Sequence, residues 1–405
     1  MARISFIPLP ETGHVNPTFK LAKQLAQRGH QVSYLGLLDF EEPVRAQGME
    51  LLPIFTGSCP KGTLRSLAEQ KLNYLEVLFR TRDHGRDREI LAALGAAAPD
   101  LVLIDIVLQD LTLLAREAGV PCAVLSTSLH QPRLIFLETL QDPVHDHPLL
   151  VLCPRAFDFP HAAQRAGRHY LEPSIDLERR DSGGFPWEKL EDSRPLIYCS
   201  LGSHPHDYKQ SEAFFRAVIG AAPQRPQWQL ILAAGRAHIG DPVFQDLPPN
   251  VLAVDWVPQL EVLEKAHLMI THGGLGTVKE CIYFGVPMVV FPMDFDQPEN
   301  AERIAHHGLG LRGSTADVSA RQVLLLVDKV LKDPAFKTRV AAMSATFREI
   351  EGSGIGVRIV EGLVDSLRND GPRARSPFRR GGPIDGTDPI DEIPLAAAVG
   401  EGGTD

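Results

Sequence analysis

The chain has 405 residues, 44% of them apolar and 23% charged, a composition typical of a soluble globular protein with room for two domains. Its formal net charge of −10 argues against a general affinity for nucleic acid, whose phosphates recruit basic surfaces. No stretch reaches the roughly 18 consecutive apolar residues of a membrane span, and the apolar run at residues 4–9 is too short for a signal peptide.

Alternating strands and helices are predicted for the first half of the chain. Short apolar runs indicate buried parallel strands at residues 4–9, 31–38, 101–104 and 122–125. A helix should follow the first strand, with Asn16 as its cap and Pro17 at its first position, and another should span residues 110–118. Parallel strands joined by helices predict a doubly wound α/β sheet.

The same pattern restarts in the second half, after a charged, glycine-containing linker at residues 177–194. Strands are expected at residues 196–200, 229–233, 251–254, 268–271 and 288–291, with helices at 277–284 and 298–307. We therefore predict a first domain at 1–176, a second domain at 195–345, and a helix at 346–370 that packs back on the first domain. Residues 371–405, rich in Gly and Pro, are expected to be a disordered tail.

A glycine-rich turn between a predicted strand and helix, residues 273–277, is the first candidate binding element. Glycine lets the backbone approach a ligand closely, and the amides at a helix start attract a diphosphate. A turn without a ligand is the alternative. The sequence does not match the dinucleotide fingerprint, because Lys279 occupies the position of the required third glycine, and it contains no P-loop.

Two further side chains suit a nucleotide. Glu280 lies one turn into the same helix, where a carboxylate can accept both hydroxyls of a ribose, although an acid is also favoured there by the helix dipole. Trp256 follows a predicted strand and can stack on a base, although a core aromatic is an equally good interpretation.

The order and spacing of these elements resemble the sugar-nucleotide signature of family 1 glycosyltransferases, the UDP-glycosyltransferase superfamily with the GT-B fold. The bacterial branch, which glycosylates macrolides, carotenoids and other natural products, is the more similar. The resemblance implies two Rossmann-like domains facing across a cleft. It also implies that donor-binding roles fall to Ser203, Trp256, Val257, Gln259, His272, Gly274, Gly276, Thr277, Glu280, Asp296 and Gln297. Plant members carry Asn at the position of Gly276, whereas bacterial relatives have Gly there, as this chain does.

The same resemblance assigns catalysis to His14 as general base and to Asp105 as the acid that orients it. The chemistry is reasonable in itself, because an alcohol is a poor nucleophile and an imidazole titrates near neutrality. A carboxylate behind the ring fixes its tautomer. We expect an inverting transfer of a hexose, with glucose favoured, from a UDP-sugar to a small hydrophobic acceptor. A catalytically inactive binding protein and a UDP-sugar epimerase are the alternatives.

No cofactor or metal is expected. Asp294-Phe295-Asp296 spells a metal-binding Asp-x-Asp, but the helix start and His272 can neutralise a leaving diphosphate instead. Paired histidines occur at residues 145–147, 204–206 and 306–307, and no third ligand with a useful spacing accompanies them. Residues 61–88 mix basic and apolar side chains, which leaves open a peripheral contact with a membrane surface. Five scattered cysteines favour reduced thiols and a cytoplasmic location, and the protein is expected to be a monomer or homodimer.

Overall fold

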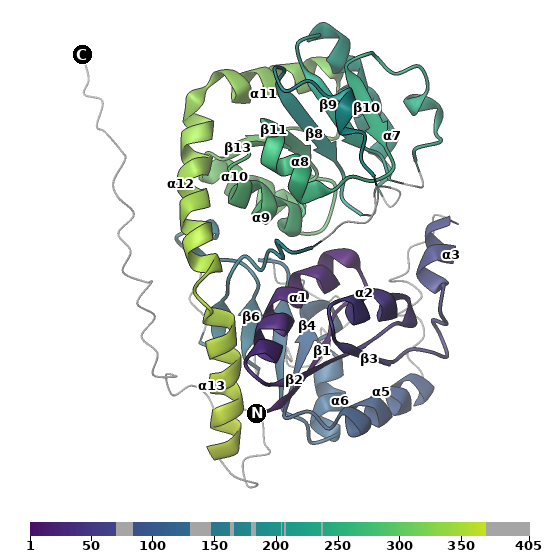
Figure 1. The fold of residues 1–405 in the computed structure, drawn as a ribbon, viewed down its shortest axis with the longest axis vertical. Coiled ribbons are helices and arrows are strands. Elements are labelled where there is room, and N and C mark those ends of the chain that lie inside the picture. The colour runs from purple at the N-terminus through teal and green to yellow at the C-terminus, as the bar shows by residue number, and fades with distance from the viewer. Residues whose placement is uncertain are drawn as a thin grey trace, which may run out of the picture.

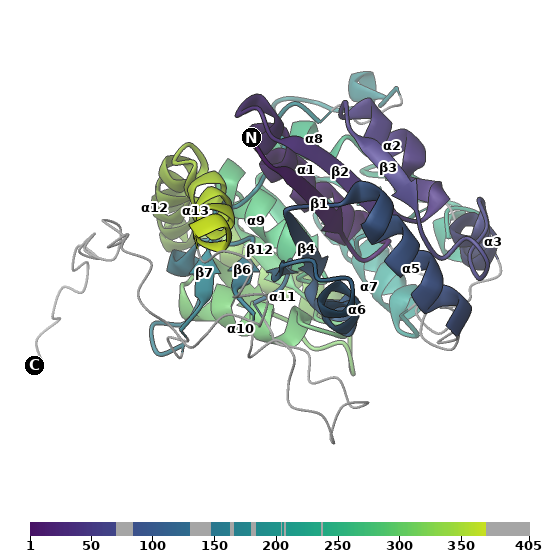
Figure 2. The same ribbon diagram turned by 90° about the horizontal axis from the view of Figure 1, so that it is seen from below.

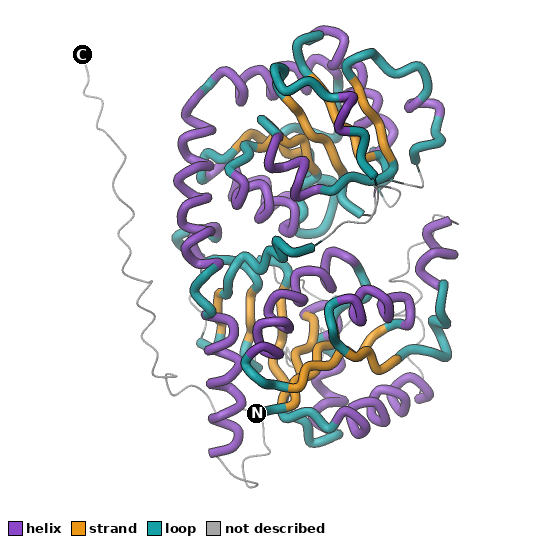
Figure 3. The backbone as a smooth tube through the Cα atoms, in the orientation of Figure 1, coloured by secondary structure: helices purple, strands orange, loops and turns teal. Residues whose placement is uncertain are grey.

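Two α/β domains lie one above the other in the computed structural model (Figure 1), which describes residues 1–69, 84–129, 147–162, 166–179, 184–203, 205, 208–235 and 238–369. The predicted tail at 371–405 and much of the mixed basic and apolar stretch, residues 70–83, lie outside the described residues. Figure 3 shows the strands of the two domains as separate groups, each flanked by helices.

The first domain is built on a parallel sheet with the strand order β3-β2-β1-β4-β5-β6-β7. Its strands are β1 (Arg3–Ile7), β2 (Gln31–Gly36), β3 (Glu50–Pro53), β4 (Leu101–Asp105), β5 (Cys122–Ser126), β6 (Leu149–Val151) and β7 (Arg168–Tyr170). Its described helices are α1 (Thr12–Gln27), η1 (Leu38–Phe40), α2 (Glu41–Ala46), α3 (Thr63–Glu69), α5 (His84–Ala97), η2 (Ile106–Leu108), α6 (Leu111–Glu117) and η5 (Arg155–Phe157).

The second domain repeats this plan with the order β10-β9-β8-β11-β12-β13, again all parallel. Its strands are β8 (Leu196–Ser200), β9 (Gln229–Ala233), β10 (Val251–Val254), β11 (Leu268–Thr271), β12 (Met288–Val290) and β13 (Gly310–Arg312). Its helices are α7 (Ser211–Ala221), η8 (Ala222–Gln224), η9 (Pro242–Phe244), α8 (Gln259–Lys265), α9 (Leu275–Phe284), α10 (Gln297–His306) and α11 (Ala320–Lys332). The segment between the domains holds η6 (Trp187–Lys189).

Each sheet is apolar on both faces because helices cover both. In β4, Leu101 and Leu103 pack with α1, while Val102 and Ile104 pack with α5 and α6 on the other side. This alternation follows from the two-residue period of a strand. Figure 2 shows α5 and α6 together below the first sheet, with α1 across it from them. A doubly wound α/β fold is the result, as the sequence predicts.

The start of α1 differs from the prediction. The helix begins at Thr12, with Glu11 as its N-cap residue, so Asn16 does not cap it and Pro17 lies inside it. The carbonyl of Glu11 accepts hydrogen bonds from the amides of His14 (2.9 Å) and Val15 (2.8 Å). Because Pro17 has no amide hydrogen, one hydrogen bond is missing within this helix. His14 consequently lies in the first turn of a helix and not in the preceding loop.

Two consecutive helices at the end of the described chain cross from one domain to the other (Figure 1). The first, α12 (Pro334–Glu351), packs on α9 of the second domain, and the next, α13 (Ile355–Asn369), packs on α1 of the first. The carboxylate of Glu351 accepts from the amides of Ser174 and Ile175, both at 3.0 Å, which fastens the crossing point to the first domain. No helix among the described residues is long and apolar enough to cross a membrane.

Polar contacts between buried groups hold α9 and α10 of the second domain against the first. Lys279 donates from Nζ to the carbonyl of Leu152 at 2.6 Å, and Arg303 donates from Nε to Asp158 Oδ1 at 3.0 Å. The side chains of Arg303 and Asp158 are 6% and 1% exposed. Buried charges of this kind are expensive unless they are paired, so these contacts fix how the two domains meet along these helices.

Candidate active site

His14 and Asp105 meet at the edge of the first sheet, where two neighbouring strands end. Strands β1 and β4 are paired in parallel with Ile7 opposite Ile104, so the segments that follow them lie side by side. His14 Nδ1 lies 2.8 Å from Asp105 Oδ2, and Asp105 is 2% exposed. The second oxygen of Asp105 accepts from the amide of Val107 at 2.9 Å, which fixes the carboxylate. The pair has the geometry of an oriented general base.

The charge of His14 is set by the acids around it. Burial lowers the pKa of its imidazole, but Asp105, Glu11 and Asp296 together outweigh burial and raise the pKa from 6.5 to about 9. His14 is therefore protonated at neutral pH, and it must lose that proton before it can act as a base.

Thr127 and Ser128 were not anticipated from the sequence, although hydroxyl residues directly after a buried strand are a usable signal. They follow β5, the strand beside β4. Thr127 Oγ1 lies 3.0 Å from His14 Nδ1, and Ser128 donates from Oγ to Asp296 Oδ2 at 3.0 Å. Two consecutive residues of the first domain thus join the candidate base to an acid of the second domain.

The glycine-rich turn forms the start of α9. Gly274 is the N-cap residue, and Gly276 and Thr277 belong to the first turn, whose amides have no partners within a helix. A Cβ atom on Gly274 would lie 2.7 Å from His272 Nε2, and one on Gly202 would lie 2.8 Å from His272 Cε1. Glycine is therefore required where the loops after β8 and β11 converge on His272, and the amides point to an anion site.

His272 is neutral in this setting. Burial lowers the pKa of its imidazole to about 4, which a hydrogen bond with the backbone of Ser200 only partly opposes. Since His272 is neutral, the positive potential at this point comes from the helix start. Ser203, next to Gly202, is exposed at the same edge of the sheet.

Both oxygens of Glu280 already have partners within the chain. Arg179, from the segment between the domains, donates from Nη1 to Oε1 at 3.0 Å, and Gln259 donates from Nε2 to Oε2. Gln259 in turn accepts from the hydroxyl of Tyr198 at 3.0 Å. Gln259 therefore positions Glu280 here. The sequence does not indicate that Arg179 contacts Glu280, because the path of a linker depends on tertiary structure.

Trp256 and Val257 lie between β10 and α8, at the same edge of the second sheet. Trp256 is half-buried, which leaves part of its ring accessible. Val257 is 5% exposed and its side chain packs in the core, so its role in donor binding stays a prediction. The base-stacking role of Trp256 stays a prediction.

Asp296 and Gln297 open α10 but face different surroundings. Asp296 contacts the first domain through Ser128, as described above. Gln297 is 3% exposed: its Oε1 accepts from the amides of Met293 (2.9 Å) and Asp294 (3.0 Å), and its Nε2 donates to the Tyr208 hydroxyl at 2.9 Å. Gln297 braces the loop before α10, and its contact with a sugar stays a prediction.

The candidate metal motifs do not converge in the described part of the chain, where no group of three or more His, Cys, Asp or Glu could hold a metal ion. Asp294 accepts from the amide of Phe295, while Asp296 turns to Ser128. His307 Nε2 lies 3.1 Å from the carbonyl of Phe157, so it is engaged in packing. The other histidine pairs involve residues 145, 146, 204 and 206, which lie outside the described residues.

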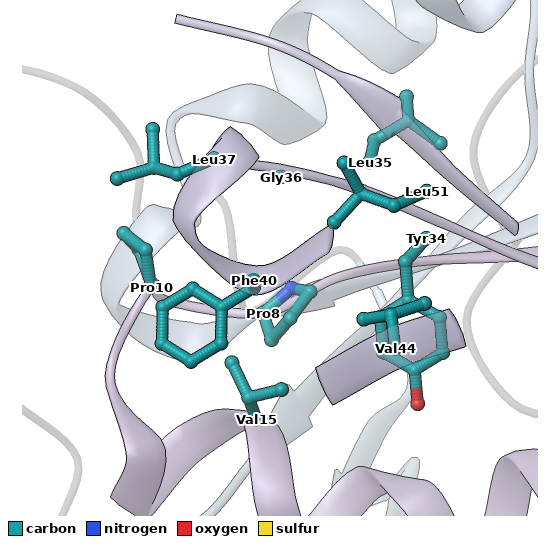
Figure 4. A pocket seen from close by; sticks show the side chains of 10 residues that line it. All are labelled: Pro8, Pro10, Val15, Tyr34, Leu35, Gly36, Leu37, Phe40, Val44 and Leu51. Carbon is teal, nitrogen blue, oxygen red and sulfur yellow. The ribbon is translucent and has the colours of Figure 1, made fainter. Parts of the chain in front are cut away.

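A small apolar pocket opens beside the start of α1 (Figure 4). Its empty volume of about 230 Å³ includes space that is open to solvent, so the enclosed part is smaller still. It is too small to be an acceptor site by itself. It is lined by Pro8, Pro10, Val15, Tyr34, Leu35, Gly36, Leu37, Phe40, Val44 and Leu51.

Comparison with known proteins agrees with this arrangement. The family model described as the erythromycin biosynthesis protein CIII-like C-terminal domain matches residues 231–349. The NDP-glycosyltransferase YjiC of Bacillus subtilis (strain 168) is 28% identical, over 89% of this chain and 97% of its own length. The oleandomycin glycosyltransferase of Streptomyces antibioticus is also 28% identical, over 89% and 90%.

Solved structures show the same fold. The glycosyltransferase of kitacinnamycin is 26% identical and matches with a TM-score of 0.68, covering 90% of this chain and 99% of its own. The spinosyn forosaminyltransferase SpnP is 20% identical and matches with a TM-score of 0.71 over 90% and 99%. With two doubly wound domains the chain has the GT-B fold, and it is a glycosyltransferase similar over most of its length to bacterial natural-product glycosyltransferases.

Proposed function

We propose that the enzyme is an inverting glycosyltransferase that moves a hexose, with glucose favoured, from a UDP-sugar to a hydroxyl of a small hydrophobic acceptor. The observation that carries this proposal is the His14–Asp105 pair, held at 2.8 Å. A glycosyltransferase that retained only sugar-nucleotide binding would not need such a pair. The same argument disfavours an epimerase, because epimerisation requires no base for an acceptor.

The pair suits direct displacement at the anomeric carbon. Nδ1 of His14 contacts both Asp105 and Thr127, which assigns Nε2 to the acceptor hydroxyl. As the acceptor oxygen attacks, His14 takes its proton and Asp105 stabilises the imidazolium. The carbon–oxygen bond to the diphosphate breaks on the opposite face, so the anomeric configuration inverts. General-base help of this kind is typically worth roughly 10²–10⁴-fold in rate.

The leaving diphosphate would be stabilised at the start of α9. The amides of this first turn point out of the helix, and the dipole favours negative charge there. His272 adds a neutral donor beside the same turn. This arrangement supports a reaction that needs no metal ion. We expect turnover to be undiminished when excess EDTA is added to the assay.

Uridine is favoured over thymidine because Glu280 offers two carboxylate oxygens to a ribose that carries both hydroxyls. Among the proteins of similar fold, the spinosyn rhamnosyltransferase SpnG has been solved with thymidine diphosphate. A hydrolysis screen without acceptor, comparing UDP-glucose with dTDP-glucose and other nucleotide sugars, reports the donor directly.

The test of the proposed activity is UDP release with a panel of hydroxylated acceptors. Wild-type enzyme should release UDP in an acceptor-dependent way, and the His14→Ala variant should bind UDP with unchanged affinity but lose most of the transfer. Undiminished turnover by His14→Ala would remove His14 from the role of base. Macrolides and carotenoids belong in the panel, because relatives are an oleandomycin glycosyltransferase and a zeaxanthin glucosyltransferase. A cytoplasmic location fits the five buried, unpaired cysteines.

A further inference from the structure

The loop between β12 and α10 carries an exposed aromatic residue at the edge of the active site. Phe295 is 64% exposed and its backbone has a φ of +56°. The loop follows a strand of a parallel sheet, and ligands of such sheets bind outside the carboxyl ends of the strands. Both features of Phe295 are unusual for a large apolar residue.

A left-handed backbone is unfavourable for a phenylalanine, and it persists only where the surrounding structure imposes it. Phe55 is also left-handed, with a φ of 63°, but it is 3% exposed and Arg86 lies 5.4 Å above its ring. Packing therefore offsets the strain at Phe55. At Phe295 most of the side chain faces solvent, so packing offsets little of the backbone strain.

The loop that holds Phe295 is well braced. Its neighbours Met293 and Asp294 donate their amides to Gln297 Oε1, at 2.9 and 3.0 Å. The amide of Phe295 itself donates to Asp294 Oδ1 at 2.8 Å. Gln297 is in turn fixed by Tyr208. The strained conformation is thus imposed by hydrogen bonds, and their effect is to hold an aromatic ring out of the core.

The position of Phe295 relative to the reaction follows from two contacts of neighbouring residues. The next residue, Asp296, accepts from Ser128 at 3.0 Å, and the residue before Ser128, Thr127, lies 3.0 Å from His14 Nδ1. An acceptor hydroxyl must reach His14, so the body of the acceptor extends through the region that these residues border. The side chains that contact the imidazole of His14, Asp105 and Thr127, are polar, whereas the body of an apolar acceptor also needs an apolar surface to pack on.

We propose that Phe295 provides this apolar surface. It is a specificity-determining residue whose ring packs on the ring system of the acceptor next to the reacting hydroxyl. This inference rests on the proposed function. The ligand class is an alcohol or phenol with a flat or alicyclic apolar body, because such a surface covers an aromatic face over the largest area. Packing of the ring on the donor sugar instead is the competing outcome of the test.

The experiment measures binding of 2-naphthol to enzyme saturated with UDP, by calorimetry, so that no turnover is required. Covering about half of a phenylalanine side chain corresponds to roughly a ten-fold change in affinity. Phe295→Ala should therefore bind 2-naphthol about ten-fold more weakly than wild type, with unchanged affinity for UDP and unchanged acceptor-free hydrolysis of UDP-glucose. Phe295→Gly, which accepts the left-handed backbone, should show the same loss and melt no lower than wild type.

Leu325→Ala is the matched control, since Leu325 is an exposed apolar residue (62%) on α11, outside the site. It should leave 2-naphthol binding unchanged. Equal 2-naphthol affinity in wild type and Phe295→Ala would overturn the proposal, as would failure of the wild type to bind 2-naphthol. A loss confined to UDP-glucose affinity would place the ring against the donor and overturn it too. Failure of the proposed function differs from all of these, because it appears as absent UDP release across the whole acceptor panel.

Discussion

Replacing Arg179 with Met should tighten the binding of a ribonucleoside. In the donor-free enzyme Arg179 occupies Glu280 Oε1 at 3.0 Å, and Gln259 occupies the other oxygen. If the ribose hydroxyls bind to Glu280 as proposed, they compete with at least one of these partners. Removal of Arg179 eliminates one competitor, whereas an arginine that helped to hold the nucleotide would have the opposite effect.

The size of the effect follows from the exposure of the pair. The side chains of Arg179 and Glu280 are 22% and 10% exposed. Exposed ion pairs contribute roughly 0.2–1 kcal/mol, and hydrogen bonds to charged groups about 1.5–3 kcal/mol. A partly buried pair lies between these ranges, so its loss should release about 1 kcal/mol. That corresponds to an affinity increase of roughly five-fold.

Calorimetric titration with uridine is the assay, because uridine carries the ribose but not the diphosphate. Deleting a cation also weakens long-range attraction for an anion, and an uncharged ligand removes that contribution. Arg179→Lys should be intermediate, since its ammonium keeps the charge but lacks the planar guanidinium. The control ligand 2′,3′-dideoxyuridine should bind wild type and Arg179→Met equally.

Weaker binding of uridine to Arg179→Met would refute the reasoning. So would an equal gain for dideoxyuridine, because the gain would then not involve the ribose hydroxyls. Either result would also remove Glu280 from the ribose-binding role that its position suggests.

Other predictions concern the base, the turn and the domain contact. Because the pKa of His14 is raised to about 9, kcat/KM of the wild type should increase with pH up to about pH 9. Asp105→Asn should shift this increase to lower pH and reduce the plateau value of kcat/KM by roughly 10²–10⁴-fold. The same raised pKa means that the stability contributed by the ion pair is fully present below the unfolded pKa of 6.5 and is lost as the pH rises through about 9. Thermal melts should show this loss for wild type and not for Asp105→Asn. Gly274→Ala should weaken UDP binding at least ten-fold, because its Cβ would lie 2.7 Å from an imidazole nitrogen, and an unchanged affinity for UDP would contradict the steric argument. Arg303→Met should lower the free energy of unfolding by roughly 3–5 kcal/mol in denaturant titration, since it leaves a buried carboxylate short of its partner, and a loss under 1 kcal/mol would mean that the contact does little.

Much of the fold could be predicted because the parallel strands are continuous apolar runs. Four strands of the second sheet, β8 to β11, begin and end at the predicted residues. The short strands β3, β6, β7 and β13 were not predicted, since three or four residues rarely establish a period. The start of α1 was placed too late because Pro17 was interpreted as a first-turn residue.

The positions of site residues could be predicted where they depend on the order of strands along the chain. Properties that depend on burial by other parts of the fold could not. His14 follows β1 and Asp105 ends β4, and adjacent parallel strands bring such residues together. The neutral state of His272 could not be predicted, because its low pKa arises from burial by neighbouring loops. Nor could the contact of Arg179 with Glu280, because it depends on the path of the segment between the domains.

The last described helix has a consequence for engineering hybrids of these enzymes. Although α13 follows the second domain in the chain, Val360, Leu363 and Val364 are buried in the same apolar cluster as Phe19 and Leu25 of α1. A chimera that joins the first half of one parent to the whole remainder of another would pair a foreign α13 with that core. Recombination should therefore use two junctions, so that residues 355–369 always travel with the N-terminal half.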